Sequence, residues 1–294
     1  TMQNVLRREI VLNTAYNQKL RIAGTVNDSI VDGPGIRYVL FFQGCPMRCQ
    51  YCHNPDTWNA ADGKEKTVDE ILEMFERNRS FYRTGGITAT GGEPMVQMDF
   101  LLELFTKAKE KQIHTCLDTS GIMFVEDKDS DAFTKIEKLM AVTDLVMLDL
   151  KHIEIEAHEK LTGQSNERIL AFARYLDDIQ KPVWIRHVVV PGITSEEASL
   201  RKVGEFLKTL SNIEKLEVLP YHTLGENKYE NMGMEYPLKG VPQLSKDEAT
   251  EAENIIRKAW GKPLSNQDDI KKNEANKVSE NTDEKSGGIV CRTC

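Results

Sequence analysis

Long apolar runs are missing from this sequence of 294 residues. No stretch approaches the roughly 18–20 consecutive apolar residues that a membrane-spanning helix needs, and residues 1–8 lack the apolar run of a secretory signal. A basic excess is also missing, because 38 Lys and Arg stand against 46 Asp and Glu. The resulting net charge of -8 disfavours binding to nucleic acid. We therefore expect a monomeric, cytoplasmic protein that binds neither a membrane nor nucleic acid.

Cysteine is scarce and unevenly distributed. The six cysteines are Cys45, Cys49, Cys52, Cys116, Cys291 and Cys294. A disulfide framework would spread its cysteines through a small secreted fold, whereas three of these fall within eight residues. Such clustering indicates metal or redox chemistry. We expect Cys116 to be a small buried hydrophobic residue, and the two cysteines of the carboxyl end to have no catalytic role.

Candidate strands alternate with candidate helices from about residue 37 onward. The strands are expected at residues 37–43, 86–90, 113–118, 145–150, 183–190 and 215–219. Capping boxes should open three of the helices, at residues 67–70, 194–197 and 245–248. Strands separated by helices of ten or more residues are typical of βαβ units and a parallel sheet. About six units predict an α/β protein with an open partial (β/α)6 barrel of parallel strands and outer helices.

The composition divides the chain into three parts. We expect an N-terminal extension over residues 1–20, a barrel domain over residues 21–261 and a tail over residues 262–294. The tail is rich in Lys, Asn, Asp, Glu and Ser and has almost no large apolar side chains. Because it cannot bury enough apolar surface to offset the entropy of ordering, the sequence predicts that it is disordered.

A C-x3-C-x2-C motif, Cys45, Cys49 and Cys52, directly follows the first predicted strand. Three thiolates on one loop can hold three corners of a four-iron cluster and leave the fourth iron open to a substrate. Ligands of parallel α/β folds bind at the carboxyl ends of the strands, where this loop lies. A zinc site with His53 as the fourth ligand is the alternative, although adjacent side chains diverge. A plain electron carrier is a second alternative and would need a fourth protein ligand.

The predicted strand at residues 145–150 has a polar face and an apolar face. Met147, Asp149 and Lys151 share one face, and the alternate residues are all apolar. The apolar face should pack under helices, so the polar face should point into the barrel. A structural ion pair is the alternative for Asp149 and Lys151. If Arg186 is buried, it needs a ligand carboxylate or an inward acid as its partner, because an unpaired buried charge is costly. An arginine that caps the end of a strand is the alternative.

The cysteine motif, the aromatic Tyr51 and the sequence Gly91-Gly92-Glu93-Pro94 at the end of the second predicted strand together resemble the radical S-adenosylmethionine (SAM) superfamily. An ordered set of segments resembles one family in it, the pyruvate formate-lyase activating enzymes. These segments are residues 32–37, 41–45, 51–54, 57–58, 114–119, 146–151, 183–186, 188–192 and 219–222. The resemblance runs from about residue 24 to residue 260.

The resemblance implies the chemistry. In that family a reduced [4Fe-4S] cluster cleaves SAM into methionine and a 5'-deoxyadenosyl radical, which generates a glycyl radical on pyruvate formate-lyase under anaerobic conditions. A flavodoxin or ferredoxin is the implied electron donor. The segment at residues 27–31 looks more like the activase of anaerobic ribonucleotide reductase, a much shorter protein. Another glycyl radical enzyme is therefore an alternative target, and a zinc-binding interaction module is the alternative of a different class.

The resemblance also implies roles for individual residues. The cluster ligands would be Cys45, Cys49 and Cys52. The SAM-binding residues would be Tyr51, Cys52, His53, Gly92, Glu93, Asp149, Lys151, Arg186 and His222. Glycine lets the backbone approach a ligand closely, and the carboxylate of Glu93 suits the ammonium of the methionine moiety. A satisfied structural histidine is the alternative for His222.

Two further sites follow from the same resemblance. A monovalent cation would bind to Asp118, Thr119, Met147 and Asp149. Asp32 would lie near the incoming glycine loop of the partner protein. Simple turn chemistry, an Asp before a Gly, is the alternative for Asp32.

Overall fold

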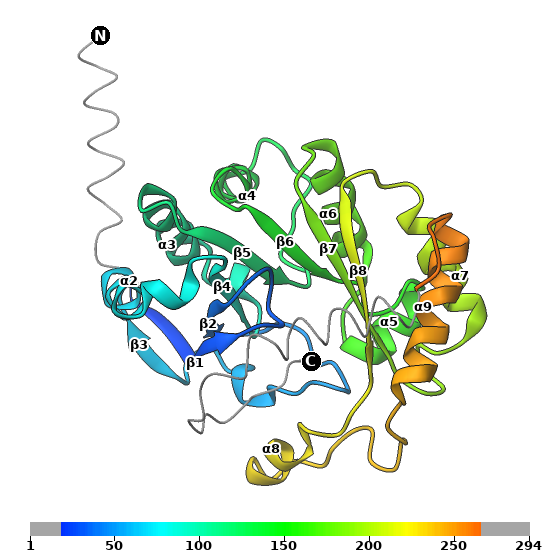
Figure 1. The fold of residues 1–294 in the computed structure, drawn as a ribbon. Helices are drawn as coiled ribbons and strands as arrows, with labels where there is room; N and C mark the ends of the chain where they lie inside the picture. The colour runs from blue at the N-terminus through cyan, green and yellow to red at the C-terminus, as the bar shows by residue number, and fades with distance from the viewer. Residues whose placement is uncertain (1–18, 266–294) are drawn as a thin grey trace.

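The computed structural model describes residues 19–265 and contains an eight-stranded sheet in the order β3-β1-β2-β4-β5-β6-β7-β8. Six neighbouring strands are parallel: β2 (Arg37–Phe42), β4 (Gly86–Gly91), β5 (His114–Thr119), β6 (Leu145–Asp149), β7 (Val183–Val189) and β8 (Ile213–Pro220). The sheet curls but does not close (Figure 1), because β8 and β3 are its two edges. This confirms the predicted open barrel of six parallel strands.

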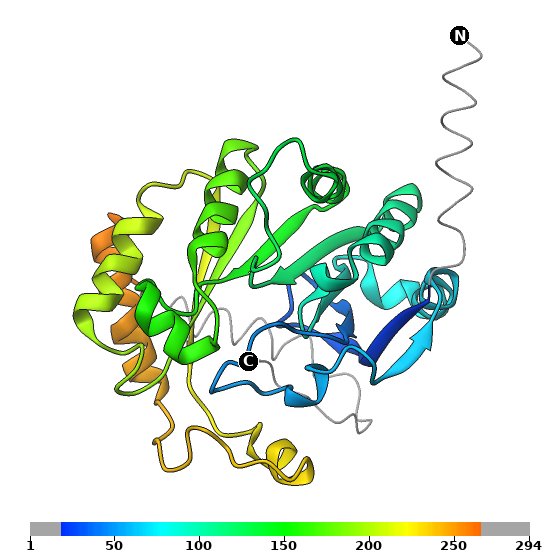
Figure 2. The ribbon, with the colours of Figure 1, turned by 180° about the vertical axis from the view of Figure 1, so that it is seen from behind.

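Helices cover the outer face of the sheet, as the view from behind shows (Figure 2). They are α2 (Val68–Arg77), α3 (Met98–Glu110), α4 (Asp131–Ala141), α5 (Ile155–Thr162), α6 (Glu167–Asp178), α7 (Glu197–Leu207) and α9 (Lys246–Trp260). The short helix α8 (Glu226–Asn231) lies apart from the sheet (Figure 1). Three short 3-10 turns lie between them: η1 (Pro55–Thr57), η2 (Arg79–Tyr82) and η3 (Pro94–Gln97). No helix among residues 19–265 is long and apolar enough to cross a membrane.

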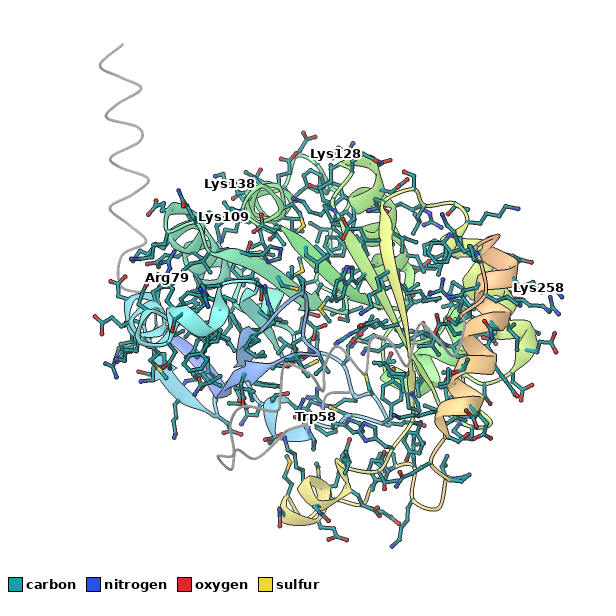
Figure 3. The ribbon with its side chains drawn as sticks, viewed as in Figure 1. Trp58, Arg79, Lys109, Lys128, Lys138 and Lys258 are labelled. Atoms are coloured by element: carbon teal, nitrogen blue, oxygen red, sulfur yellow. The ribbon has the colours of Figure 1, made fainter. Side chains whose placement is uncertain are left out.

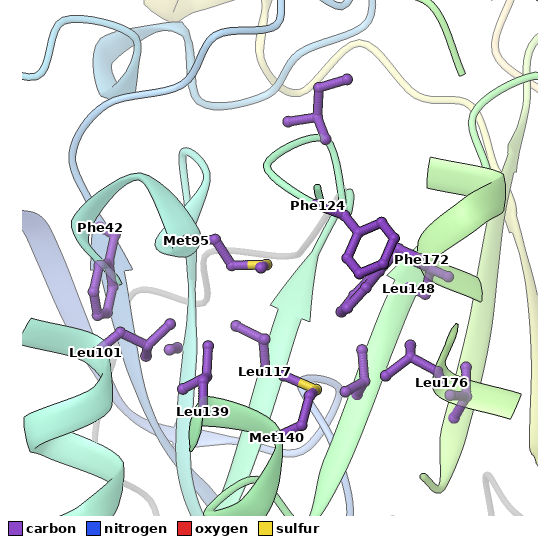
Figure 4. Close-up of a cluster of buried hydrophobic side chains, with 14 of the residues drawn as sticks. Phe42, Met95, Leu101, Leu117, Phe124, Leu139, Met140, Leu148, Phe172 and Leu176 are labelled. Atoms are coloured by element: carbon purple, nitrogen blue, oxygen red, sulfur yellow. The ribbon is translucent and has the colours of Figure 1, made fainter. Parts of the chain in front are cut away.

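The main hydrophobic core lies between the sheet and these helices. Leu117 of β5 and Leu148 of β6 point outward from the barrel into a cluster that includes Leu139 of α4 and Phe172 of α6 (Figure 4). Strand alternation places the neighbouring residues on the inner face. The predicted alternation of apolar outward and mixed inward residues in β6 is therefore confirmed.

A second, smaller apolar cluster fills the inner face of the barrel. Cys116, Leu145 and Met147 are buried there, and Trp184 packs against them. Cys116 is fully buried, which confirms that it is a small buried hydrophobic residue. The part of the barrel near the start of β5 and β6 is thus a packed core, as in closed barrels of this kind.

Two of the three predicted capping boxes are present. Thr67 caps α2 and Ser245 caps α9, each with the reciprocal bond from its glutamate. The box predicted at residues 194–197 is wrong, because α7 begins after Glu196 without a side-chain cap. The hydroxyl of Thr194 is used in the preceding turn, where it accepts from the Val190 N–H at 2.7 Å.

Four elements were not predicted from the sequence. The strands β1 (Leu20–Ser29) and β3 (Lys64–Lys66) add antiparallel to the β2 edge. β3 is an edge strand of only three residues, and β1 lies between β3 and β2 and contains many polar residues, so the alternation of both strands is weak. The helices α5 and α8 have only eight and six residues. The predicted N-terminal extension and tail, with Cys291 and Cys294, lie largely or wholly outside the described residues, so the division into three parts stays a prediction.

Candidate functional site

A cavity of about 320 Å³ opens at the carboxyl ends of the parallel strands. It brings together most of the predicted site residues: Cys45, Cys49, Tyr51, Cys52, His53, Gly92, Asp118, Thr119, Asp149, Lys151 and Arg186. Trp58 marks this end of the molecule in Figure 3, whereas Lys109, Lys128 and Lys138 project from the opposite end. Four predicted residues, Asp32, Glu93, Met147 and His222, do not line the cavity.

The cysteine loop, residues 45–52, is fastened to the end of α5. The N–H of Arg48 donates to the carbonyl of Thr162 at 2.7 Å, and the N–H of Gln50 donates to the carbonyl of Leu161 at 3.0 Å. These carbonyls belong to the last turn of the helix, where no intrahelical donor remains for them. A helix that the sequence analysis missed therefore supports the loop that it identified.

The three thiols of the loop face one cavity and form no disulfide. Cys49 is buried, whereas Cys45 and Cys52 are half-buried. Burial, together with the nearby Glu93 and Cys49, raises the pKa of the Cys45 thiol to about 12. A thiolate at this position therefore needs a positive centre beside it, which the irons of a cluster supply. The donor set fits a cluster held at three corners.

The environment of His53 does not support the zinc alternative. Its Nε2 lies 3.0 Å from the carbonyl oxygen of His222, and the two imidazole rings stack at 4.1 Å. The ring is thus engaged with another strand end.

Two glycines bring bare backbone to the cavity wall. Gly91 has a φ of +107°, and a Cβ there would lie 2.5 Å from the backbone nitrogen of Phe42. A Cβ on Gly92 would lie 2.4 Å from the carbonyl oxygen of Gly44. No other residue fits these positions without displacing backbone, so the close packing of this turn against the end of β2 and the start of the cysteine loop depends on glycine.

The carboxylate of Glu93 has a different position from the expected one. Its side chain is 1% exposed and accepts hydrogen bonds from the hydroxyls of Thr119 and Ser120, both at 2.6 Å. The N–H of Ser120 and that of Met95 also donate to it. The expectation that this carboxylate faces the ammonium of a ligand is therefore corrected: it joins the end of β4 to the end of β5.

Arg186 joins two carboxylates at the centre of the site. Its Nη2 lies 2.6 Å from Oδ1 of Asp118, and its Nε lies 3.0 Å from Oδ1 of Asp149. Lys151 approaches the other oxygen of Asp149 at 2.9 Å. Inward acids thus satisfy the buried guanidinium, as one of the sequence alternatives predicted. The structural ion pair between Asp149 and Lys151 is also present.

The two carboxylates differ in their titration. Burial alone would raise the pKa of Asp149, but Arg186 and Lys151 beside it lower this pKa to about 2. Burial raises the pKa of Asp118 to about 7, although Arg186 opposes this shift. Asp149 is therefore ionised at neutral pH, and the ion pair with Arg186 opposes the protonation that burial favours at Asp118. The hydroxyl of Thr90 donates to Asp118 at 2.5 Å.

The predicted cation ligands are close in the sheet but engaged with protein groups. Asp118 stands opposite Met147 in the register of β5 and β6. The carboxylates of Asp118 and Asp149 bind Arg186, and Thr119 donates its hydroxyl proton to Glu93. A cation site formed by these residues stays a prediction.

Two more of the predicted site residues, His222 and Asp32, lie outside the cavity wall. His222 follows β8 and stacks on His53 at the border of the cavity. Asp32 lies deeper in the barrel, where its side chain is 2% exposed and accepts a hydrogen bond from the hydroxyl of Ser29. Its backbone carbonyl accepts from Thr88 at 2.7 Å.

Sequence reasoning missed several residues of the cavity wall. Thr90 could have been found, because strand alternation places it on the inner face immediately before Gly91. Leu224 and Lys228 had no local signal, because they reach the cavity from the loop after β8 and from α8. Lys228 binds Asn54 at 2.8 Å and Asp56 at 2.9 Å across more than 170 residues of sequence.

Comparison with known proteins adds an independent observation. The family model described as the radical SAM superfamily matches residues 39–203. The pyruvate formate-lyase-activating enzyme of Streptococcus mutans is 51% identical over 243 residues, which cover 80% of this chain and 92% of that protein. The chain belongs to the pyruvate formate-lyase-activating enzyme family of the radical SAM superfamily. A second family member, from Staphylococcus aureus strain USA300, is 48% identical over 76% of this chain and 88% of that protein.

A solved structure supports the fold of this family member. A radical SAM methyltransferase from Sphaerobacter thermophilus superposes with a TM-score of 0.56 at 16% identity. The match covers 89% of this chain and 80% of that structure. Membership of the activating enzyme family carries with it a [4Fe-4S] cluster and SAM as cofactors. These relatives favour neither the ribonucleotide reductase activase nor the zinc-binding module.

Proposed function

We propose that this protein activates pyruvate formate-lyase under anaerobic conditions by generating a glycyl radical on it. The observation that carries the proposal is the cavity in which Cys45, Cys49 and Cys52 face the bare backbone of Gly91 and Gly92. The curated relatives that are 44–51% identical to the chain bear the name of this activity.

The cofactors have suitable places in the cavity. The thiolates of Cys45, Cys49 and Cys52 would hold three irons of the cluster, and the backbone around Gly92 would receive the amino group of SAM. When bound, the reduced cluster supplies one electron for cleavage of SAM to methionine and a 5'-deoxyadenosyl radical, which takes a hydrogen atom from a glycine Cα. The protein's own residues bind, orient and shield these groups.

The charged residues of the cavity would orient SAM. Lys151 lies within 5.8 Å of the centre of the Tyr51 ring and beside the ionised Asp149. These groups would flank the methionine moiety, while Tyr51 and His53 would lie along the adenine and His222 near the ribose. Because the ion pairs fix Arg186 and Asp149 before a ligand arrives, little reorganisation is needed on binding. A monovalent cation at Asp118, Thr119, Met147 and Asp149 is part of the proposal.

The loop after β8 would shield the cavity from water and oxidants. Leu224 lines the cavity and is 63% exposed. Lys228 joins this segment to Asp56, next to the cysteine loop, and the rings of Tyr229 and Trp58 meet edge to face at 5.8 Å. Exclusion of water protects a reactive radical from side reactions.

The remaining partners also belong to the proposal. Pyruvate formate-lyase would present a loop that contains the glycine, with Asp32 near that loop. A flavodoxin or ferredoxin would donate the electron. We propose that the protein acts as a monomer in the cytoplasm.

One experiment tests the function directly. The anaerobically reconstituted and reduced protein is mixed with SAM and pyruvate formate-lyase, and electron paramagnetic resonance is recorded. We expect the signal of a glycyl radical and an equivalent amount of 5'-deoxyadenosine. The same mixture with anaerobic ribonucleotide reductase is the comparison. A radical formed only on the reductase would contradict the proposed target, and the absence of both products would contradict the proposed activity.

A further inference from the structure

The helix α8, in the connection after β8, contacts the short turn η1 that follows the cysteine loop (Figure 1). Strand pairing does not close the described sheet, because β8 and β3 are its edges. The turn η1 follows β2, near the margin opposite β8. The contact between α8 and η1 therefore joins the two sides of the open barrel at the carboxyl ends of the strands.

Lys228 of α8 is the polar centre of this contact. Its Nζ lies 2.8 Å from Oδ1 of Asn54, and 2.9 Å and 3.2 Å from the two carboxylate oxygens of Asp56. The side chain is 35% exposed and lines the cofactor cavity. Asn54 and Asp56 flank Pro55, the first residue of η1. One ammonium thus binds the chain on both sides of the residue at which η1 begins.

Bare backbone lets the connection after β8 approach the last cysteine. A Cβ on Gly225 would lie 2.8 Å from the Cα of His53 and 3.1 Å from the carbonyl oxygen of Cys52. Any other residue here would displace one of the two segments. The ring of His222 stacks on that of His53 in the same contact. Lys228 therefore lies at an interface in which the two segments pack closely.

The turn η1 in its own right holds the start of the cysteine loop. The carbonyl of Thr57 accepts from the N–H of Gly44 at 2.7 Å, and the carbonyl of Trp58 accepts from the N–H of Cys45 at 3.3 Å. Both outer cysteines of the motif are thus connected to this turn. Cys52 is connected through the chain, and Cys45 is connected through hydrogen bonds.

We propose that Lys228 is a positioning residue that fixes Cys45 and Cys52 relative to each other, through η1, for the cluster that these thiols hold. The inference rests on the proposed function only for the identity of that cluster. Because α5 binds the middle of the same loop, η1 and α5 hold the loop at different places. Groups that orient metal ligands from outside the ligand set commonly change metal affinity by 10-fold to 100-fold or so when they are replaced.

A surface ion pair that acts only on overall stability is the alternative role for Lys228. The aromatic contact beside Lys228 favours the positioning role. The ring of Tyr229 meets that of Trp58 edge to face at 5.8 Å, and the carbonyl of Trp58 binds the N–H of Cys45. The two roles predict different results. An ion pair changes global unfolding, whereas a positioning residue changes the cysteine loop locally.

The first test measures amide hydrogen exchange in the full-length protein without cofactors. Lys228→Met removes the ammonium, Lys228→Arg keeps the charge, and Lys239→Met alters an exposed lysine of the same connection between β8 and α9. Loss of hydrogen bonds to a charged group predicts roughly tenfold faster exchange at Gly44 and Cys45 in Lys228→Met. Lys228→Arg should restore most of the protection, and Lys239→Met should equal the wild type.

The second test measures the rate at which a chelator removes iron from the reconstituted proteins. We expect roughly tenfold faster loss from Lys228→Met, while the midpoint of thermal unfolding falls by less than about 4 °C. The conservative Lys228→Arg should again restore most of the wild-type behaviour, and Lys239→Met should not differ from the wild type.

Unchanged exchange at Gly44 and Cys45 in Lys228→Met would overturn the inference. Equally faster exchange at Arg48 and Gln50, which α5 holds, would also overturn it, because this pattern indicates a general loss of stability. If Lys228→Met does not fold, Asp56→Asn, which weakens the same contact from the other side, decides. A wild-type protein that binds no cluster would instead contradict the proposed function, and the exchange rates would still decide whether Lys228 fixes the loop.

Discussion

The inner face of the barrel has two regions that lie on the same strands and differ in chemistry. Toward the start of β5 and β6, Cys116, Leu145 and Met147 form a dry apolar cluster. Two residues further along these strands, Asp118 and Asp149 bind Arg186. The first region closes the barrel below the site, so that the second can hold charges away from water. Position along a strand, rather than the strand itself, decides whether an inward residue packs or binds.

The largest expected effect compares the cysteine loop with the dry region. Cys49→Ala removes one of three proposed cluster ligands, so SAM cleavage should fall to background, whereas Cys116→Ala removes only a buried thiol and should retain most activity. Formation of 5'-deoxyadenosine by the reconstituted proteins measures both. Full activity in the Cys49 variant would refute the cluster assignment. Loss of cluster iron in the Cys116 variant would refute the distinction between the cysteine loop and the dry apolar cluster.

Arg186→Met tests the charged region. The substitution leaves Asp118 and Asp149 buried without their shared cation, which should lower the free energy of unfolding by about 3–5 kcal/mol. SAM cleavage should fall roughly a hundredfold, because the charges that orient the ligand are displaced. Calorimetry and single-turnover assays measure the two effects. Arg201→Met, which breaks an exposed helical ion pair, is the control and should change stability by less than about 0.5 kcal/mol.

Leu148→Ala tests the outward face of the strand that carries Asp149. Leu148 is fully buried in the core between the sheet and the helices. The cavity left by the substitution should lower the free energy of unfolding by about 2–5 kcal/mol. The folded fraction should bind SAM with nearly unchanged affinity, as isothermal titration would show. Ile179→Ala, at an exposed position, is the control, and a large change in SAM affinity would contradict the separation of the two faces.

His158→Gln tests how stability depends on pH at α5, the helix that supports the cysteine loop, and its effect is confined to acidic pH. Burial lowers the pKa of His158 to about 4. Between about pH 6.5 and pH 4 the unfolded chain therefore takes up a proton that the folded chain does not, so stability falls as the pH falls, by up to about 3 kcal/mol. The variant has no imidazole at this position, so its free energy of unfolding should lack this part of the pH dependence. Thermal unfolding of both proteins from pH 4 to pH 7.5 gives the difference, and parallel curves would contradict it.

Local signals explain which parts of the fold could be predicted. The strand β2 and the caps of α2 and α9 depend on residues within a few positions of one another, and all three were predicted. The failed cap of α7 shows the limit, because Thr194 and Glu197 match the capping pattern while the turn before the helix uses the hydroxyl of Thr194. The strand β1 shows a second limit of local signals, because its pairing with β2, and not an alternation in its own sequence, stabilises it.

The residues of the candidate site also divide into those that local sequence patterns predict and those that only tertiary contacts place. Strand alternation correctly placed Asp149 on the inner face, and an inward acid was one of the alternatives predicted for Arg186. The position of Glu93 could not be predicted, because Thr119 and Ser120 of another strand end provide its donors. Lys228 joins Asp56 through a tertiary contact alone. Sequence patterns therefore identified the residues that carry chemistry better than those that hold them in place.

The attachment of the cysteine loop to α5 has a consequence for sequence variation. The loop is fixed through main-chain atoms, from Arg48 to Thr162 and from Gln50 to Leu161. Side chains of the spacer add to this attachment, because Arg48 also donates to the carbonyls of Cys45 and Met47, and Gln50 donates to that of Lys160. The position of the thiols therefore depends on a helix that lies 110 residues later in the chain, so a substitution that unravels the end of α5 would disturb the cluster site without touching a cysteine.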